Sequence, residues 1–302
     1  MKKNVDKFKF YVIILFELLL LPFFYLFEEI KKRISSGKEL KVKRIREEII
    51  EKKIFINIHE WGGYDWERSK NIKNISPFDC GLKFQIERFE NNESCYEKYI
   101  NLTISEAHKF KFLEEVRNRV NNIDFVSNSG MDFSGYSFFL NKIKNLPNAF
   151  VILTNTSVNK TQTTFLNDYI TYMEKNPDVG ILGVSYSGRM YQTFVRNNFT
   201  PHLQSFFLLT TISVLNEIVR LNNDKFPGEN INHKLLLIRK GEINISNLAL
   251  QLGYNLAVTL ENGSVYKFGR NSIFDNGYRR WKLYKTDVRL FNSNPNLINE
   301  IN

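Results

Sequence analysis

The sequence predicts an α/β fold in which a mostly parallel sheet is flanked by helices. From residue 54 onward, short apolar segments typical of strands alternate with longer segments of helical period. The segment Ala149–Thr154 is apolar at nearly every position, as expected of a strand that is covered on both faces. With 302 residues, 43% of them hydrophobic, the chain is long enough for one large domain and a short appendage.

The elements of the main domain follow from these patterns in chain order. We expect strands at Ile54–Ile58, Ile123–Ser127, Ala149–Thr154 and Val179–Tyr186. We expect helices at 105–121, Tyr136–Asn145 and 162–174. Residues 59–101 are rich in Asn, Gly and aromatic side chains and predict a loop-rich insertion. Three parts result, namely a membrane-associated helix with a basic connector (1–53), the main domain (54–290) and a polar tail that frays (291–302).

The amino-terminal segment Phe10–Phe27 is about as long as the shortest membrane-spanning helices. Glu17 and Pro22 interrupt it, which leaves two interpretations, a single spanning anchor or a helix lying in the membrane interface. The structural alternative to both is a helix buried in the protein core. The more basic flank after this segment places the following domain on the cytoplasmic side of the inner membrane. The connector Glu28–Lys53 is expected to be amphipathic, with its basic side near anionic headgroups.

The net charge of +10 suits nucleic acid, an anionic membrane or phosphorylated small molecules. Because basic residues cluster on both sides of the apolar segment, the charge favours a membrane surface. The aromatic and cationic residues of 278–282 fit a nucleic-acid surface, but the apolar anchor argues against that partner. Cys80 and Cys95 are the only cysteines and predict two reduced thiols rather than a disulfide framework or a metal site.

Candidate site residues follow the predicted strands, whose carboxyl ends form the usual ligand-binding edge of a parallel sheet. Asn128, Gly130 and Asp132 come after the second strand. A glycine permits close backbone approach to a ligand, and a carboxylate accepts hydrogen bonds from ribose or sugar hydroxyls. The structural alternative is that Asp132 caps the next helix.

Asn155 and Ser157 follow the third strand, where nucleotide-sugar enzymes often carry paired aspartates that hold Mn²⁺ or Mg²⁺. No paired-Asp motif occurs here, and neutral side chains bind a divalent cation poorly. The pattern therefore favours metal-independent binding of a diphosphate, with Lys160 nearby, over a metal site. An ordinary polar loop is the structural alternative.

The remaining candidates lie further along the chain. Arg189 and Arg196 are cations suited to phosphate. His202, Gln204 and Ser205 form a polar cluster before an apolar run, as substrate-contacting or as structural residues. We expect Glu242 at the start of a helix that Gly253 ends, where it is suited to act as a general base. Its structural alternative is a favourable interaction with the helix dipole.

Together these segments resemble the rhamnan-synthesis-F-type bacterial glycosyltransferases. The residues that carry the resemblance are Asn128 to Asp132, Asn155 to Ser157, His202 to Phe207, Glu242 to Ser246 and Gly253–Tyr254. Their order and spacing match over about residues 120 to 260, and the His-Leu-Gln-Ser element is the most specific. Met131 stands where the family often has a basic residue, and Asn155–Thr156 lacks the acidic residue common there.

The resemblance implies a GT-A-like fold and a hexosyltransferase-type enzyme. It would move a sugar from a nucleotide-sugar donor to a lipid-linked or growing surface glycan, as in capsule or lipopolysaccharide synthesis. By analogy, Asp132, Asn155 and Ser157 lie near the donor. Glu242 stands where such enzymes place the base, and we expect inversion at the anomeric carbon. The alternative is a non-catalytic membrane-associated glycan-binding or assembly protein on a degenerate fold, which the missing paired aspartates favour.

Overall fold

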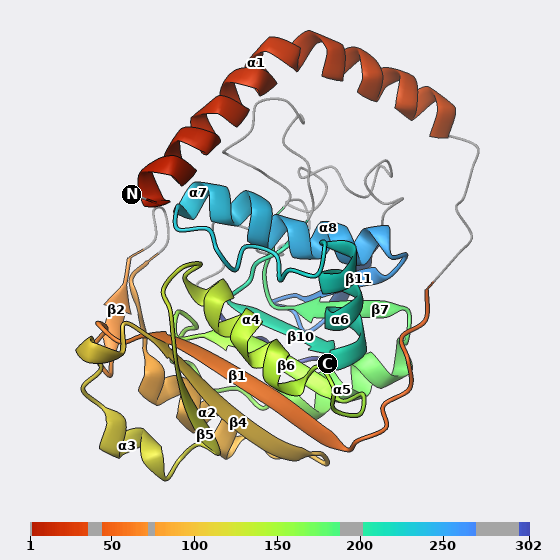
Figure 1. The fold of residues 1–302 in the computed structure, drawn as a ribbon. Coiled ribbons are helices and arrows are strands. Elements are labelled where there is room, and N and C mark those ends of the chain that lie inside the picture. Colours follow the sequence, from red (N-terminus) through yellow and green to blue (C-terminus); the bar gives the residue numbers. More distant parts are fainter. Residues whose placement is uncertain (1, 36–43, 72–75, 188–201, 270–295) are drawn as a thin grey trace.

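The computed structural model of the chain describes residues 2–35, 44–71, 76–187, 202–269 and 296–302. An eight-stranded sheet runs through the protein in the order β12-β11-β7-β10-β6-β1-β4-β5 (Figure 1). Its strands are β1 (Lys53–Trp61), β4 (Glu97–Ser105), β5 (Asn122–Val126), β6 (Phe150–Asn155), β7 (Val179–Gly183), β10 (Phe207–Thr211), β11 (Asn255–Thr259) and β12 (Val265–Phe268).

The sheet is mostly parallel, which confirms the predicted class. β5, β4, β1 and β6 run in one direction, and β7 pairs with β11 in parallel. β10 lies antiparallel between β6 and β7, and β12 is an antiparallel edge strand. β6 and β7 are buried at every position because layers of helices cover both faces of the sheet.

Alternation along the strands divides the core in two. In β1, Ile54, Ile56 and Ile58 enter one apolar cluster, with helices α2 (Leu82–Asn91) and α5 (Leu166–Lys175). Phe55 points to the other face and joins the cluster of helices α4 (Asp132–Ile143), α6 (Ile212–Leu221) and α8 (Ile243–Gln251). Fully burying a side chain of this size contributes about 1.5 to 3 kcal/mol, so both layers stabilise the sheet.

The expected loop-rich insertion at 59–101 is more regular than predicted. It contains the hairpin of β2 (Arg68–Lys70) and β3 (Phe78–Cys80), then α2 and the central strand β4. The polar residues of β4 obscured its strand pattern, and they are buried because they bond across the sheet. Asn101 Nδ2, for example, donates to Asn57 Oδ1 at 3.1 Å.

The prediction of a helix at 105–121 is largely wrong. Glu106 has a φ of 56°, which interrupts any regular helix, and a 3₁₀ turn, η1 (Ala107–Lys109), follows. Only α3 (Leu113–Arg117) is α-helical in this region. The remaining described strands are β8 (Tyr186–Ser187) and β9 (His202–Leu203), which pair with each other.

Glu242 does not begin a helix. Helix α7 (Lys234–Leu237) continues through a π-helical turn, η2 (Ile238–Glu242), directly into α8. The dipole explanation for this carboxylate is therefore wrong, since no free helix amino terminus lies there. Gly253, with a φ of +95°, lies just beyond the end of α8, as predicted.

Helix α1 (Lys2–Ser35) lies across the side of the molecule that carries α7 and α8 (Figure 1). Asp6 accepts a hydrogen bond from the Asn232 amide at 2.9 Å, and the ring of Phe10 packs 5.4 Å from that of His233. Among the described residues, no helix carries an apolar stretch long enough to span a bilayer.

Two terminal segments differ from expectation. In the connector, Arg46 is buried and its guanidinium donates to the Met173 carbonyl, so this cation does not face lipid headgroups. At the carboxyl terminus, residues 296–302 do not fray. Ile298 is buried, and Tyr169 donates a hydrogen bond to the Asn299 carbonyl at 2.6 Å. Both segments pack because each finds buried partners on α5.

Candidate functional site

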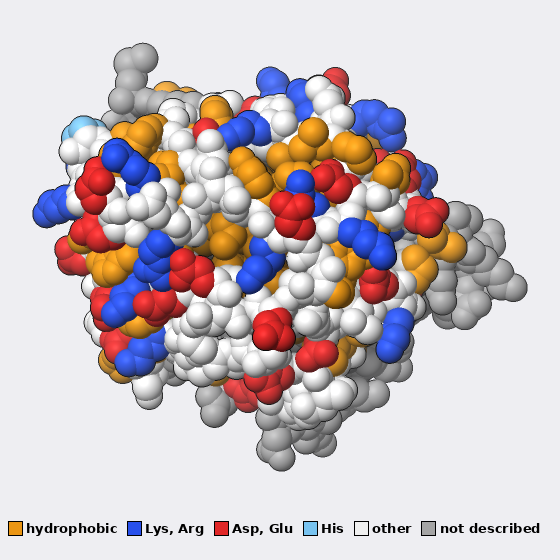
Figure 2. All heavy atoms as spheres, turned by 90° about the horizontal axis from the view of Figure 1, so that it is seen from below, with side chains coloured by type: hydrophobic (Ala, Val, Ile, Leu, Met, Phe, Trp, Pro, Cys, Tyr) orange, Lys and Arg blue, Asp and Glu red, His pale blue; other side chains and the backbone are white. Residues whose placement is uncertain are grey.

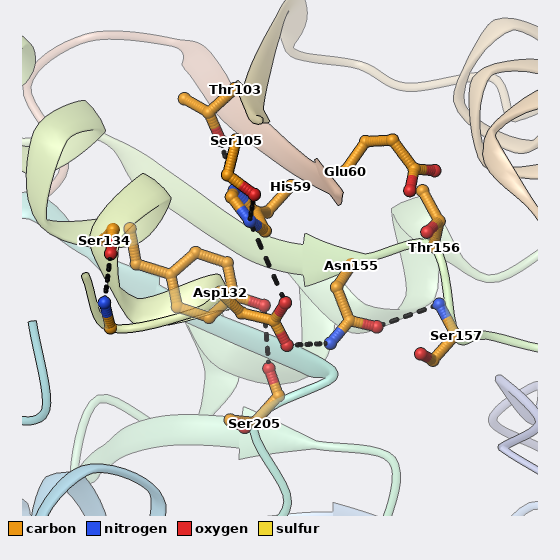
Figure 3. A network of polar contacts seen from close by, with 12 residues as sticks. His59, Glu60, Thr103, Ser105, Asp132, Ser134, Asn155, Thr156, Ser157 and Ser205 are labelled. Carbon is orange, nitrogen blue, oxygen red and sulfur yellow. Dashed lines mark hydrogen bonds and ion pairs between the residues drawn. The ribbon is translucent and has the colours of Figure 1, made fainter. Parts of the chain in front are cut away.

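The candidate site lies where the strand order switches. From β1 the chain builds β4 and β5 on one side of the sheet and then β6 on the other side. In open α/β sheets, ligands bind outside the carboxyl ends of the strands at such a point. Figure 3 shows the polar side chains that gather at this edge from β1, β4, β6 and α4.

Asp132 and Asn155 form a hydrogen-bonded pair at this edge. Asn155 Nδ2 donates to Asp132 Oδ2 at 2.6 Å, and Asn155 Oδ1 accepts from the Ser157 amide at 2.9 Å. The amide group of Asn155 is thereby fixed in orientation. The Asp132 side chain is 36% exposed, so this carboxylate is accessible to a ligand. The structure thus brings together these three predicted residues.

His59 lies behind Asp132 at the end of β1. Its Nδ1 is 3.1 Å from the Thr103 hydroxyl, and its Nε2 is 3.9 Å from Asp132 Oδ1. Burial lowers the pKa of His59, and Asp132 only partly opposes this, so the imidazole is neutral at pH 7. Helix α4 approaches it closely at Gly135, where a Cβ would lie 2.2 Å from His59 Nδ1.

Glu60, at the same edge, was not predicted from the sequence. It is 2% exposed, and neither of its carboxylate oxygens accepts a hydrogen bond of normal geometry from the described residues. Burial raises the pKa of Glu60 to about 8, although Arg68, 3.8 Å away, and the Thr156 hydroxyl both lower it. Glu60 is therefore largely protonated at pH 7.

Two cations of the β2–β3 hairpin lie near this edge, Arg68 beside Glu60 and Lys70 within electrostatic range of Arg68 and Asp132. Arg68 Nη2 donates to the carbonyl and hydroxyl oxygens of Thr156, each at 3.1 Å. Its Nη1 is buried without a hydrogen bond among the described residues. Burial, together with the positive charges of Arg68 and Lys234, lowers the pKa of Lys70 to about 8, although Cys80 and Asp132 oppose this shift. An anion bound here would offset this local excess of positive charge.

Glu242 is held by the segment that precedes β10. Its Oε2 accepts hydrogen bonds from the amide and hydroxyl of Ser205 at 2.9 and 2.8 Å, and its Oε1 lies 3.6 Å from His202 Nε2. Burial would raise the pKa of Glu242, but the contacts from His202 and Ser205 outweigh burial and lower it. Tyr136 of α4 donates to the Ser205 carbonyl at 3.0 Å, which links this group to the Asp132 side of the site.

Other predicted residues have local structural partners. Asn128 accepts a long hydrogen bond from Asn232 Nδ2 through its carbonyl, at 3.4 Å. The Gly130 amide donates to the Ser134 hydroxyl at 2.6 Å, and the Gln204 amide donates to the Ser185 carbonyl at 2.9 Å. These three residues shape the loops around the site rather than present side chains to its centre.

Of the cations predicted to bind phosphate, Lys160 lies among the described residues, and it is not brought to the site. Lys160 forms an ion pair with Asp79 at 2.9 Å on an exposed surface. Arg189, Arg196 and the 278–282 cluster lie outside the described residues. Within the described part of the chain, no three His, Cys, Asp or Glu side chains are grouped so that they would hold a metal ion.

No family model matches the chain, and no curated protein matches it.

Proposed function

We propose that the protein is a glycosyltransferase that uses a nucleotide-sugar donor and has a GT-A-like fold of the rhamnan-synthesis-F type. The observation that carries the proposal is the Asp132–Asn155 pair at the switch point, with the partly buried cations Arg68 and Lys70 nearby. A nucleotide sugar presents two matching features, hydroxyl groups for a carboxylate and an amide, and a diphosphate for cations.

The diphosphate is assigned to Arg68 and Lys70 rather than to Lys160. Arg68 has a buried Nη1 with no hydrogen bond among the described residues, whereas Lys160 already pairs with Asp79. Protonated Glu60 adds a donor beside them. Such preorganised groups stabilise the charge that develops on a leaving diphosphate. Arg68 and Lys70 would thus neutralise the diphosphate, as a metal ion held by paired aspartates does in other nucleotide-sugar enzymes.

The surroundings of Glu242 do not favour the role of general base. A base must accept a proton, but the pKa of Glu242 is lowered and both of its oxygens are engaged by Ser205 and His202. Asp132 is the more accessible carboxylate. In a Glu242→Gln variant, loss of transfer with retained donor binding would support the base role, and retained transfer would assign the base elsewhere.

Donor binding is tested first, by calorimetry with nucleoside diphosphates and nucleotide sugars, with Mn²⁺ and with EDTA. We expect binding that survives EDTA, and a loss of about tenfold in Lys70→Met, about 1.4 kcal/mol. The control Lys160→Met removes a cation of the same kind that lies outside the site, and its affinity should not change. If no nucleotide binds under either condition, the transferase proposal is wrong and the alternative of a glycan-binding or assembly protein is favoured.

The pH dependence gives a second test of the same assignment. Only protonated Lys70 attracts phosphate, and its pKa in the free protein is about 8. Affinity should therefore fall as the pH rises from 7 to 9 in the wild type, and should fall less in Lys70→Met. Parallel pH profiles for the two proteins would remove Lys70 from the phosphate site.

The proposal also covers the partners and the place of action. We propose an acceptor that is a lipid-linked or surface glycan, at the cytoplasmic face of the inner membrane, with α1 as the attachment. The support is the exposed apolar surface of α1, including Phe8, Leu19 and Phe23 at 65 to 69% exposure.

A further inference from the structure

A cavity of about 900 Å³ lies between the first turns of α1 and residues 222–244 of the main domain. One part of its wall is apolar and includes Phe8, Val12, Phe226 and Leu236. It lies apart from the edge at which Asp132 and Asn155 meet, since none of the residues of that pair lines it. A mainly apolar cavity of this size is typical of small-molecule sites.

Three lysines also line the cavity, Lys9 from α1 and Lys225 and Lys240 from the main domain. Within the described part of the chain, none of the three ammonium groups has an ion pair or hydrogen bond. Three unpaired cations beside an apolar wall fit a ligand with an anionic head and a hydrocarbon body.

The two carboxylates that line the cavity are engaged by other groups. Asp6 accepts from the Asn232 amide at 2.9 Å. Glu229 Oε2 accepts from the Ser137 hydroxyl at 2.6 Å and from the Phe226 amide at 3.2 Å. Both carboxylates therefore hold the walls of the cavity together, and the lysines remain available to an anion.

The cavity opens at the margin of an exposed apolar stripe. Phe8, Leu15 and Leu19 recur at helical spacing along α1 and are 69%, 58% and 65% exposed. Asp6 and Phe10 occupy the other side of the helix, where they contact the main domain. On the face away from α1, in contrast, acidic and basic side chains are interspersed (Figure 2). The stripe fits a helix that lies in a membrane interface.

We propose that this cavity binds the phosphate headgroup of an anionic lipid, with the lipid chains lying along the apolar stripe of α1. Phe8 and Val12 line the cavity, and Phe8 also belongs to the stripe, so one lipid contacts both. The lysines neutralise the phosphate, each contributing about 1 kcal/mol near a membrane surface. This second site goes beyond sugar transfer and does not require it.

The proposed lipid site contacts the loop that precedes Asp132 of the candidate active site. The Glu229 carbonyl accepts from the Ser129 hydroxyl at 3.1 Å, and a Cβ at Gly130 would meet that carbonyl at 2.3 Å. The bound phosphate therefore lies across one loop from Asp132. If the proposed transfer is correct, this placement holds a lipid-borne acceptor beside the donor.

The test measures binding of the full chain to phosphatidylcholine vesicles with and without phosphatidylglycerol. We expect Lys225→Ala/Lys240→Ala to lose about thirtyfold in affinity for the anionic vesicles only, given ~1 kcal/mol per lysine. The matched control Lys111→Ala/Lys175→Ala removes two exposed lysines remote from the cavity and should bind like the wild type. Phe8→Ser/Leu15→Ser should weaken binding to both kinds of vesicle.

Three outcomes would overturn the proposal. These are equal losses in the cavity variant and the control, binding that does not depend on anionic lipid, and binding of inorganic phosphate in place of vesicles. Thermal unfolding of each variant verifies that it is folded. Nucleotide binding, measured on the same variants, should be unchanged, so failure of the lipid site is distinguished from failure of the proposed transferase.

Discussion

Two glutamates border the same end of the sheet, Glu60 at the end of β1 and Glu242 beneath the segment leading into β10, and their surroundings are opposite. Glu242 has its oxygens engaged by Ser205 and His202, and its pKa is lowered. Glu60 is buried without a hydrogen bond of normal geometry among the described residues, and its pKa is raised to about 8.

The difference shows that burial alone does not set the charge of a carboxylate. Hydrogen bonds to the ionised form decide it, because they replace the water that burial removes. Glu242 is therefore ionised and holds its segment in place. Glu60 keeps its proton and retains unused hydrogen-bonding capacity at the switch point, as residues at ligand sites often do.

The largest expected effect is that of Glu242→Ala. The variant leaves the Ser205 amide and hydroxyl and His202 without their buried acceptor, so the free energy of unfolding should fall by about 4 kcal/mol. Denaturant titration measures this loss. Glu114→Ala, at a glutamate that is 76% exposed, should change stability by less than about 0.5 kcal/mol. Equal effects of the two substitutions would mean that Glu242 is not a structural anchor.

The second effect is the pH dependence that Glu60 imposes. Its pKa is about 8 in the folded protein and 4.5 as the unperturbed value, so the folded state binds more protons between these pH values. The contribution of protonated Glu60 to the free energy of unfolding is fully present below pH 4.5 and is lost as the pH rises through 8.

Glu60→Gln removes this titration. The stability of the variant relative to the wild type should therefore increase with pH, by about 3 kcal/mol in all between pH 5 and 8, and then level off. Unfolding titrations at several pH values measure the difference. A difference that is constant with pH would show that Glu60 is ionised like an exposed glutamate.

The smallest effect is that of Thr156→Val. The hydroxyl accepts from Arg68 and faces Glu60, so its loss should cost about 1 kcal/mol of unfolding free energy. It should also raise the pKa of Glu60 further, since Thr156 lowers that pKa. The control Thr154→Val removes a hydroxyl that donates to the Phe206 carbonyl at 2.8 Å. It should lose similar stability without moving the pH at which the Glu60 effect levels off.

The convergence of Asp132 and Asn155 was predictable from sequence. Each follows an apolar strand, and the carboxyl ends of parallel strands meet at one edge. A signal for Glu60 was present as well, because it continues the alternation of Ile54, Ile56 and Ile58 and so lies on the face of β1 that α2 and α5 cover. The position of Glu60 was predictable from the sequence, but its lack of hydrogen bonds of normal geometry among the described residues was not.

The cations were the least predictable part. Lys160 was the nearest cation in sequence to Asn155, yet it pairs with Asp79 across the hairpin. Arg68 reaches Thr156, which is 88 residues away in sequence, because the β2–β3 hairpin folds back over the end of β6. Glu242 was misplaced at a helix start because Gly241 precedes it, but this glycine lies inside the π turn that joins α7 to α8 and does not interrupt the helix there.

By itself, the sequence determined the α/β class, four of the eight strands of the sheet and the end of α8 at Gly253. These features depend on local periodicity and backbone preference, which short segments carry within them. Only the tertiary structure decided which carboxylate is protonated, which cations remain unpaired and how α1 forms a cavity with the main domain. Charge state and pairing depend on neighbours that are distant in sequence, and no local pattern specifies those neighbours.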